Sequence, residues 1–216
     1  MNMEMIVKTE AFLKKTFADS SFLQNDRAAC SYRLEHSYRV ANIAKTIALE
    51  EGFDVTYAVI GGLLHDIAYC EQMNSREDWK NHGRRSAAIA RPFLESLGLT
   101  ADVVNEICYG IAIHVDDEAD FEWERTAFCE TVGDADNIDR FDVYRVYESL
   151  QSMQFSQMSM DEKRERVNSI MEKLNGYKEI RLGTCSAKKL WLERLEYQLG
   201  FYERMRTQLE NSCSIL

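Results

Sequence analysis

Apolar residues along this chain of 216 residues recur mostly three or four positions apart, which is the spacing of one face of an α-helix. Val40, Ile43 and Ile47, for example, fall on a single face. Polar stretches and glycines separate the segments that show this pattern. The pattern predicts an all-α protein, with helices over residues 4–18, 31–51, 54–69, 82–97, 100–114, 142–154, 160–174 and 186–210.

Several residues mark where these helices are expected to begin, bend or end. Asp54 can cap the helix that follows it. Residues 70–81 are polar and are expected to form a surface loop, after which Asn81 can cap a helix that begins near His82. Pro92 lies inside that helix, and because proline has no backbone N–H, it is expected to kink or break the helix.

The stretch from Gly61 to Tyr69 is apolar except for His65 and Asp66. A buried carboxylate is normally paired or bound to a metal, because an isolated one costs several kcal/mol. A hydrogen bond between these two side chains would meet that need without a metal, and the dipeptide alone leaves this interpretation open. Gly61 and Gly62 leave a shallow groove that another helix, an ion or a substrate could enter.

The other three histidines of the chain also lie on or beside apolar helical faces. Asp136 shares such a face with Phe128 and Val132, whereas Asp134 is a weaker candidate because its face includes Glu130. A single histidine on an apolar face is usually a core residue, so the prediction rests on the whole set. The side chains expected to converge on a metal site are His36, His65, Asp66, His82, His114 and Asp136.

Composition agrees with a helical protein without membrane segments. A single proline and only 10 glycines favour helix. No apolar run approaches the roughly 20 residues that cross a bilayer. Residues 1–10 lack the order of a signal peptide, so we expect a cytoplasmic protein without membrane contact. Six widely spaced cysteines are expected to be free thiols: Cys30, Cys70, Cys108, Cys129, Cys185 and Cys213.

The net charge of −10 argues against a general nucleic-acid surface, which needs clustered Lys and Arg. It permits one small phosphorylated ligand held by a few cations. Lys80, Arg84 and Arg85 surround the expected helix start near His82, and a helix start favours anions. We therefore predict a phosphate site there, although a solvated basic turn explains the same residues. Arg39, one turn after His36, is expected to reach the same site.

The order and context of the histidines and aspartates resemble the HD-domain superfamily of metal-dependent phosphohydrolases. The superfamily pattern is H…HD…D on a helical bundle. His36 matches its first histidine, His65-Asp66 the doublet, and Asp136 the last aspartate, with the similarity covering about residues 30–142. The resemblance implies a single HD-type domain over residues 1–216, with a metal-binding core at about 30–142 and a helical extension at about 143–216.

His82 and His114 extend the resemblance to a six-ligand, two-metal variant. Diadenosine-tetraphosphate hydrolases, cyclic-dinucleotide phosphodiesterases and di-iron oxygenases have this variant. It implies that Asp66 bridges two divalent ions (Fe, Mn, Co, Mg or Zn), with His36, His65 and Asp136 on one ion and His82 and His114 on the other. The chain departs from the family at Tyr69, where many members have lysine, and it lacks the Gly-Tyr-Pro signature of the cyclic-dinucleotide group.

The leading hypothesis is a hydrolase of a phosphate ester or anhydride in a small nucleotide-like substrate. Asp66 and Arg39 would take catalytic roles, while Lys80, Arg84 and Arg85 would bind the substrate. Two alternatives stay open: a di-iron oxygenase with the same ligands, and a non-catalytic regulatory module that binds a nucleotide. The aromatic and leucine-rich face of residues 186–210 is expected to form core or a homodimer contact.

Overall fold

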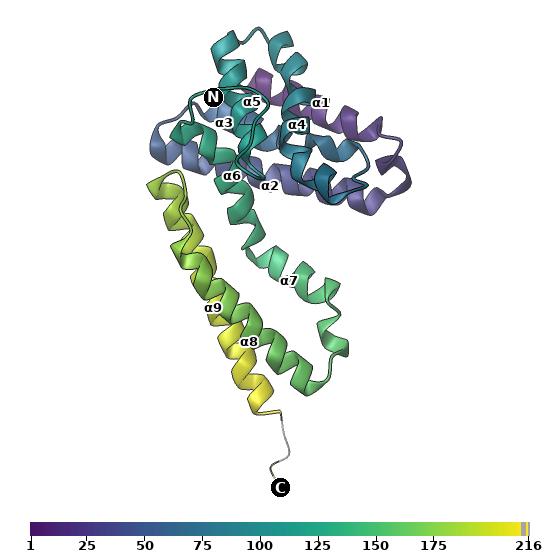
Figure 1. The fold of residues 1–216 in the computed structure, drawn as a ribbon, viewed down its shortest axis with the longest axis vertical. Coiled ribbons are helices and arrows are strands. Elements are labelled where there is room, and N and C mark those ends of the chain that lie inside the picture. The colour runs from purple at the N-terminus through teal and green to yellow at the C-terminus, as the bar shows by residue number, and fades with distance from the viewer. Residues whose placement is uncertain (213–214, 216) are drawn as a thin grey trace. The chain divides into compact units, whose positions relative to one another are not determined.

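The chain is all-helical, as predicted, in a computed structural model that describes residues 1–212 and 215. No β-strand occurs among these residues. Short 3-10 turns join several of the helices. The α-helices are α1 (Met3–Ala18), α2 (Arg27–Glu51), α3 (Val55–Leu64), α4 (Arg76–Ser96), α5 (Ala101–Ile113), α6 (Ala127–Arg140), α7 (Val143–Ser152), α8 (Met160–Gly176) and α9 (Cys185–Glu210) (Figure 1).

The helices form two compact units. The first contains Met1–Asp139 and the short segment Gly183–Ala187. The second contains Arg140–Leu182 and continues from Lys188. All six predicted metal ligands belong to the first unit.

The first unit has one apolar core to which α1, α3, α4 and α5 all contribute. The fully buried side chains include Leu13 and Phe17 of α1, Leu64 of α3, Leu94 of α4 and Ile111 of α5. Since α3 is apolar on nearly every side, its residues from Ala58 to Leu64 are all buried. This central helix carries the His65-Asp66 doublet at its carboxyl end.

The paired glycines of α3 allow two neighbouring helices to approach closely. A Cβ atom on Gly62 would lie 2.7 Å from Cα of Ala41 in α2. A Cβ atom on Gly61 would lie 2.9 Å from a methyl carbon of Val132 in α6. The sequence allows another helix, an ion or a substrate in the groove at Gly61 and Gly62. The structure shows that helices α2 and α6 occupy it.

The end of α3 explains how His65 and Asp66 reach a common site. The α-helix ends at Leu64, with His65 still in a helical conformation, whereas Asp66 leaves it with φ −105° and ψ 16°. A 3-10 turn, Ile67–Cys70, follows. The predicted helix over 54–69 is therefore shorter than expected, and the break turns Asp66 away from the direction that a continuous helix would give it.

Helix α4 begins six residues before the predicted start, so the loop expected at 70–81 is confined to residues 71–75 and the cap predicted at Asn81 is wrong. Ser75 is the N-cap, and its hydroxyl accepts a hydrogen bond from the backbone N–H of Asp78. Glu77 and Asp78 in the first turn favour this start through the helix dipole. The polar composition of residues 76–81 reflects the exposed first turns of a helix.

Pro92 does not break α4, contrary to one of the two expected outcomes. The helix is continuous from Arg76 to Ser96. Proline removes the hydrogen bond to the carbonyl of Ala88, and both residues are exposed. Water can therefore take the place of the missing N–H donor.

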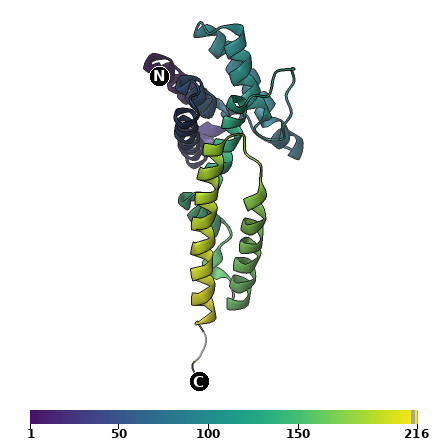
Figure 2. The ribbon, with the colours of Figure 1, turned by 90° about the vertical axis from the view of Figure 1, so that its left-hand side faces the viewer.

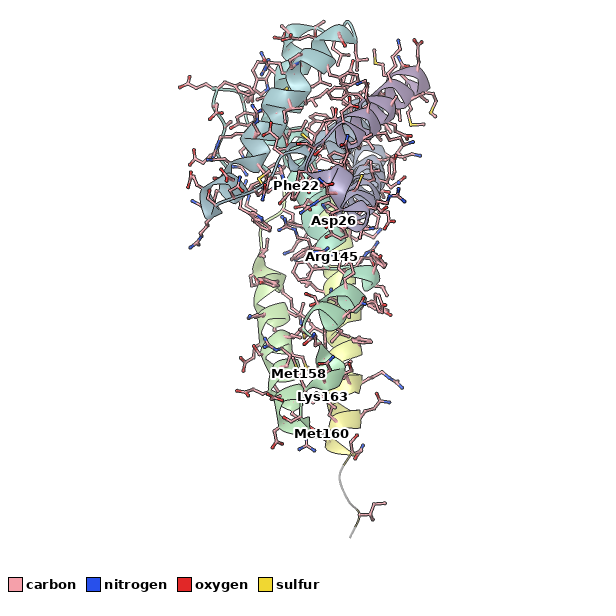
Figure 3. All side chains as sticks on the ribbon, turned by 90° about the vertical axis from the view of Figure 1, so that its right-hand side faces the viewer. Phe22, Asp26, Arg145, Met158, Met160 and Lys163 are labelled. Carbon is pink, nitrogen blue, oxygen red and sulfur yellow. The ribbon has the colours of Figure 1, made fainter. Side chains whose placement is uncertain are left out.

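The second unit consists mainly of α7, α8 and α9, with α8 and α9 side by side (Figure 2). Trp191 is buried against Phe141 and Tyr177, and its indole N–H donates to the carbonyl of Tyr177. Met160 and Lys163 lie in the first turn of α8, which follows Met158 and the N-cap residue Ser159 (Figure 3). The aromatic face of α9 thus supplies core, while a homodimer through these helices stays a prediction.

Two predictions about the whole chain concern membranes and thiols. None of the described helices has the length and apolar character that crossing a bilayer requires. Five of the cysteines are free thiols, and Cys213 lies outside the described residues.

Candidate metal centre

All six predicted metal ligands meet in the first unit, around the side chain of Asp66. Each is buried or nearly so. His36 comes from α2, His82 from α4, and Asp136 from α6, while His65 and His114 directly follow α3 and α5. Five helices separated in sequence therefore supply one cluster.

The first group of ligand atoms consists of His36, His65, Asp136 and one oxygen of Asp66. The two imidazole Nε2 atoms lie 3.2 Å apart. Oδ1 of Asp136 lies 3.1 Å from Nε2 of His36. Oδ2 of Asp66 lies 3.5 Å from Nε2 of His36 and 3.6 Å from Nε2 of His65.

The second group consists of His82, His114 and the other oxygen of Asp66. Here too the two Nε2 atoms face each other, at 3.1 Å. Oδ1 of Asp66 lies 3.2 Å from Nε2 of His82 and 3.6 Å from Nε2 of His114. Asp66 therefore directs one oxygen to each histidine pair.

Hydrogen bonds from Nδ1 to backbone carbonyls fix the orientation of three of the four imidazole rings. His65 bonds to the carbonyl of Gly62 at 2.8 Å, His82 to that of Trp79 at 2.6 Å, and His114 to that of Ile111 at 2.6 Å. Since a carbonyl oxygen only accepts, each of these Nδ1 atoms carries the proton. In a neutral ring of this tautomer, the lone pair lies on Nε2, the atom that faces the cluster.

This donor set fits a divalent cation. In the second group, two nitrogen lone pairs and a carboxylate oxygen face one another, an arrangement that a shared cation would stabilise. Ligands on one ion with bonds of roughly 2.1 Å are separated by roughly 3.0–3.4 Å. Most of the separations in the two groups, 3.1–3.6 Å, are close to this range, while Nε2 of His65 and Oδ1 of Asp136 are 3.9 Å apart. The residues present can therefore hold divalent metal, as the sequence predicts.

Electrostatics at the first group also favour positive charge. Burial opposes a charged His36, but hydrogen bonds to Asp136 and Asp139 and the nearby Asp66 carboxylate outweigh it and raise the pKa of His36 to about 9. His65 shows the opposite effect, because burial lowers its pKa to about 4. Burial would raise the pKa of Asp66, but the surrounding histidines hold it well below its usual range.

Asp139 and Arg39 form a second layer behind His36. Nδ1 of His36 lies 2.8 Å from Oδ2 of Asp139. Nε of Arg39 donates to Oδ1 of the same carboxylate at 2.7 Å, and its Nη2 donates to Oδ2 at 3.3 Å. Arg39 therefore lies next to the cluster, where it contacts the carboxylate of Asp139. Its predicted contact with a phosphoryl group stays a prediction.

Replacing Asp139 with asparagine should weaken metal binding by about 10- to 100-fold, because this carboxylate orients His36 and raises its basicity. Titration of the purified protein with Mn²⁺ or Co²⁺ measures the effect. Asp102→Asn, an exposed change in the first turn of α5, is the matched control. Equal affinity in the two variants would contradict the role of Asp139.

The predicted substrate-binding cations lie apart from a helix start, because α4 begins at Arg76 rather than near His82. Arg84 pairs with Asp116 at 3.1 Å, and Arg85 with Glu71. Lys80 is exposed. The helix-terminal anion site predicted around these residues is absent from α4, and their contact with substrate stays a prediction.

Asp134, the weaker candidate, faces a different part of the first unit. Its carboxylate accepts a hydrogen bond from the backbone N–H of Gly183 at 2.9 Å. Burial raises the pKa of Asp134 to about 7. The carboxylate of Asp136 instead reaches His36.

The sequence interpretation missed one basic residue at the centre. Nη1 of Arg33 donates to Oδ2 of Asp66 at 3.2 Å, and its guanidinium lies over the ring of Tyr69. The available signal was position: Arg33 is three residues before His36 and so shares its helix face. The sequence interpretation also missed that Asp139 orients His36. Its signal was likewise position, since Asp139 lies one turn after Asp136.

Comparisons with known proteins agree with this picture. A model of the HD domain matches residues 33–144. Ribonuclease Y 1 of Pediococcus pentosaceus is 40% identical over 74 residues, which is 34% of this chain but only 13% of that protein. The crystal structure of a predicted HD superfamily hydrolase from an uncultured Thermotogales bacterium superposes with a TM-score of 0.62 at 20% identity, covering 96% of this chain and 99% of the other. At that identity, the last likeness concerns the fold alone.

Proposed function

Because the chain belongs to the HD domain family, we propose that it is a metal-dependent phosphohydrolase that acts on a phosphate ester or anhydride of a small nucleotide-like substrate. The observation that carries the proposal is the pair of histidine groups on either side of Asp66, each with one carboxylate oxygen. We further propose that two ions bind, one at each group.

His36, His65 and Asp136 would hold one ion and His82 and His114 the other, with Asp66 shared between them. Two bound ions would lower the pKa of a water molecule and stabilise the oxygens of an in-line displacement. Hydrolysis forms a bond from water oxygen to phosphorus and breaks the P–O bond to the leaving group. The hydrogen bonds at Nδ1 keep the four rings in place throughout this step.

Aromatic side chains beside the second histidine group support a substrate with a planar base. The ring of Trp79 lies 6.2 Å from that of His82 and 6.4 Å from that of Tyr69, centroid to centroid. Trp79 is nevertheless 55% exposed. An exposed indole near a site that binds phosphate can stack on a nucleobase.

Replacing Trp79 with alanine should raise KM for a nucleotide by about 10- to 100-fold, since stacking on one base contributes roughly 1–3 kcal/mol. The KM for a phosphate ester without a base should not change. Tyr197→Ala, on a residue that is 53% exposed in α9, is the matched control. Equal losses for both substrates in the Trp79 variant would argue against base stacking.

The proposed activity is tested by phosphate release from a panel of nucleotides with protein loaded with Mn²⁺, Fe²⁺ or Co²⁺. A short oligoribonucleotide belongs in the panel, since one relative is named a ribonuclease. Lack of turnover with every metal, in protein that binds metal, would refute the proposal. Oxygen uptake with bound iron would instead indicate the oxygenase, and nucleotide binding without turnover the regulatory module.

A further inference from the structure

Arg33 brings a guanidinium group directly to the candidate metal centre. Its Nη1 lies 3.2 Å from Oδ2 of Asp66, the oxygen that faces His36 and His65. The side chain is only 23% exposed. It lies on α2, one turn before His36, so the same helix supplies a metal ligand and a cation to one site.

Two aromatic rings hold this guanidinium. Its central carbon lies 3.3 Å from the ring centroid of Tyr69 and 5.4 Å from that of Tyr32. At the shorter distance, the planar group lies in contact with the face of the phenol ring, where it gains a cation–π interaction. Tyr69 is buried and follows Asp66 by three residues, so the turn that presents the carboxylate also orients Arg33.

Arg33 retains donors that the protein does not use. A guanidinium has five N–H donors in a rigid plane. Within residues 1–212, only Nη1 of Arg33 donates to a protein oxygen. The donors on Nε and Nη2 can therefore bind the oxygens of a phosphoryl group, which Arg recognises with two parallel hydrogen bonds.

The arginines predicted to bind phosphate are engaged elsewhere. Arg39 makes a two-point contact with Asp139 behind His36. Arg84 pairs with Asp116, and Arg85 pairs with Glu71. Arg33 instead contacts a carboxylate that belongs to both histidine groups.

We propose that Arg33, held against the ring of Tyr69, binds the phosphoryl group of the substrate beside Asp66 and stabilises the negative charge that develops during hydrolysis. The inference rests on the proposed function and names the residue that binds the phosphoryl group. Arg33 is then a catalytic residue and Tyr69 a positioning residue. Tyr69 acts by orienting an arginine that another helix supplies.

The test compares Arg33→Ala and Arg33→Lys with wild type and with Arg27→Ala, an exposed residue of the same helix. Arg33→Ala should lower kcat/KM by about 100- to 1000-fold, as loss of a charge-stabilising donor does. Lysine should restore little of this, because it lacks the planar fork that stacks and binds two oxygens. Guanidinium ion in the buffer should partly rescue the alanine variant, and Arg27→Ala should behave as wild type.

Binding of inorganic phosphate to Mn²⁺-loaded protein separates this inference from the proposed function. Measured at Mn²⁺ concentrations that saturate each variant, so that a change in metal affinity does not enter, Arg33→Ala should weaken phosphate binding at least about tenfold. If wild type hydrolyses nothing but Arg33→Ala still loses phosphate affinity, the proposed function fails and the phosphate contact stands. Wild-type phosphate affinity and kcat/KM in Arg33→Ala would overturn the inference.

Tyr69 variants provide a second test that does not remove the arginine. Tyr69→Phe keeps the ring and should retain activity, whereas Tyr69→Leu should lower kcat more than it raises KM, with unchanged Mn²⁺ affinity. These variants also test the proposed role of Arg33 if Arg33→Ala does not fold. Equal kcat in Tyr69→Leu and Tyr69→Phe would contradict the positioning role.

Discussion

Asp66→Ala is expected to lose metal at both histidine groups and to lower kcat/KM by at least about 1000-fold, or ~4 kcal/mol of transition-state stabilisation. The reason is geometric, since Oδ2 of this carboxylate faces His36 and His65 while Oδ1 faces His82 and His114. Asp66 belongs to both groups of candidate ligands found in the described part of the chain. Metal content by mass spectrometry, together with phosphate release, measures both effects.

Asp134→Asn is the matched control for this experiment. Asp134 is also a buried aspartate near the centre, but its partner is the backbone N–H of Gly183, and asparagine can still accept that hydrogen bond. Metal content should therefore stay at the wild-type level. Retained activity in Asp66→Ala, or an equal loss in Asp134→Asn, would remove Asp66 from the centre of the proposed mechanism.

Gly62→Ala should destabilise the first unit by about 1–3 kcal/mol, as other overpacked cores do. The new Cβ would lie 2.7 Å from Cα and 2.9 Å from N of Ala41, and backbone atoms cannot rotate away. This cost exceeds the roughly 0.5–1 kcal/mol that alanine gains over glycine in a helix. The change also moves the carbonyl that orients His65. Urea unfolding followed by circular dichroism measures the loss.

Gly200→Ala provides the opposite control. Gly200 lies within α9, and a Cβ atom there would meet nothing within 4 Å. Only the greater preference of alanine over glycine for helix then matters, so the free energy of unfolding should rise by about 0.5–1 kcal/mol. A stabilising effect at Gly62 would show that α2 and α3 can separate without cost.

Local sequence patterns predicted the candidate ligands because each ligand lies on a regular helix face or at its end. The face of Val40 and Ile47 placed His36 inward, and the spacing from Val132 placed Asp136 inward. Asp136 is preferred over Asp134 because its helix face carries Phe128 and Val132, whereas the face of Asp134 includes Glu130. The structure supports the geometry because both aspartates are buried, but only Asp136 reaches His36.

The start of α4 could not be predicted from apolar spacing, because its first turns are exposed and contain few apolar residues. The capping pair of Ser75 and Asp78 was the local signal for that start. The predicted phosphate site required a helix start near His82. Because α4 begins at Arg76, Lys80, Arg84 and Arg85 do not surround a helix start. The arginine that contacts Asp66, Arg33, lies 33 positions from it. Its place one turn before His36 indicates the helix face that it shares, but not its partner.

The four imidazole rings of the candidate metal centre differ in the sequence separation between each histidine and the group that hydrogen-bonds to its Nδ1. His65, His82 and His114 each bond to the carbonyl three residues earlier, so each ring is set by its own helical turn. His36 alone depends on a distant partner, Asp139, which is 103 residues away. The geometry of the His82–His114 pair therefore needs only α4 and α5, whereas that of His36 also needs α6, which carries Asp139. His36 is thus the ring whose orientation depends on the packing of α2 with α6.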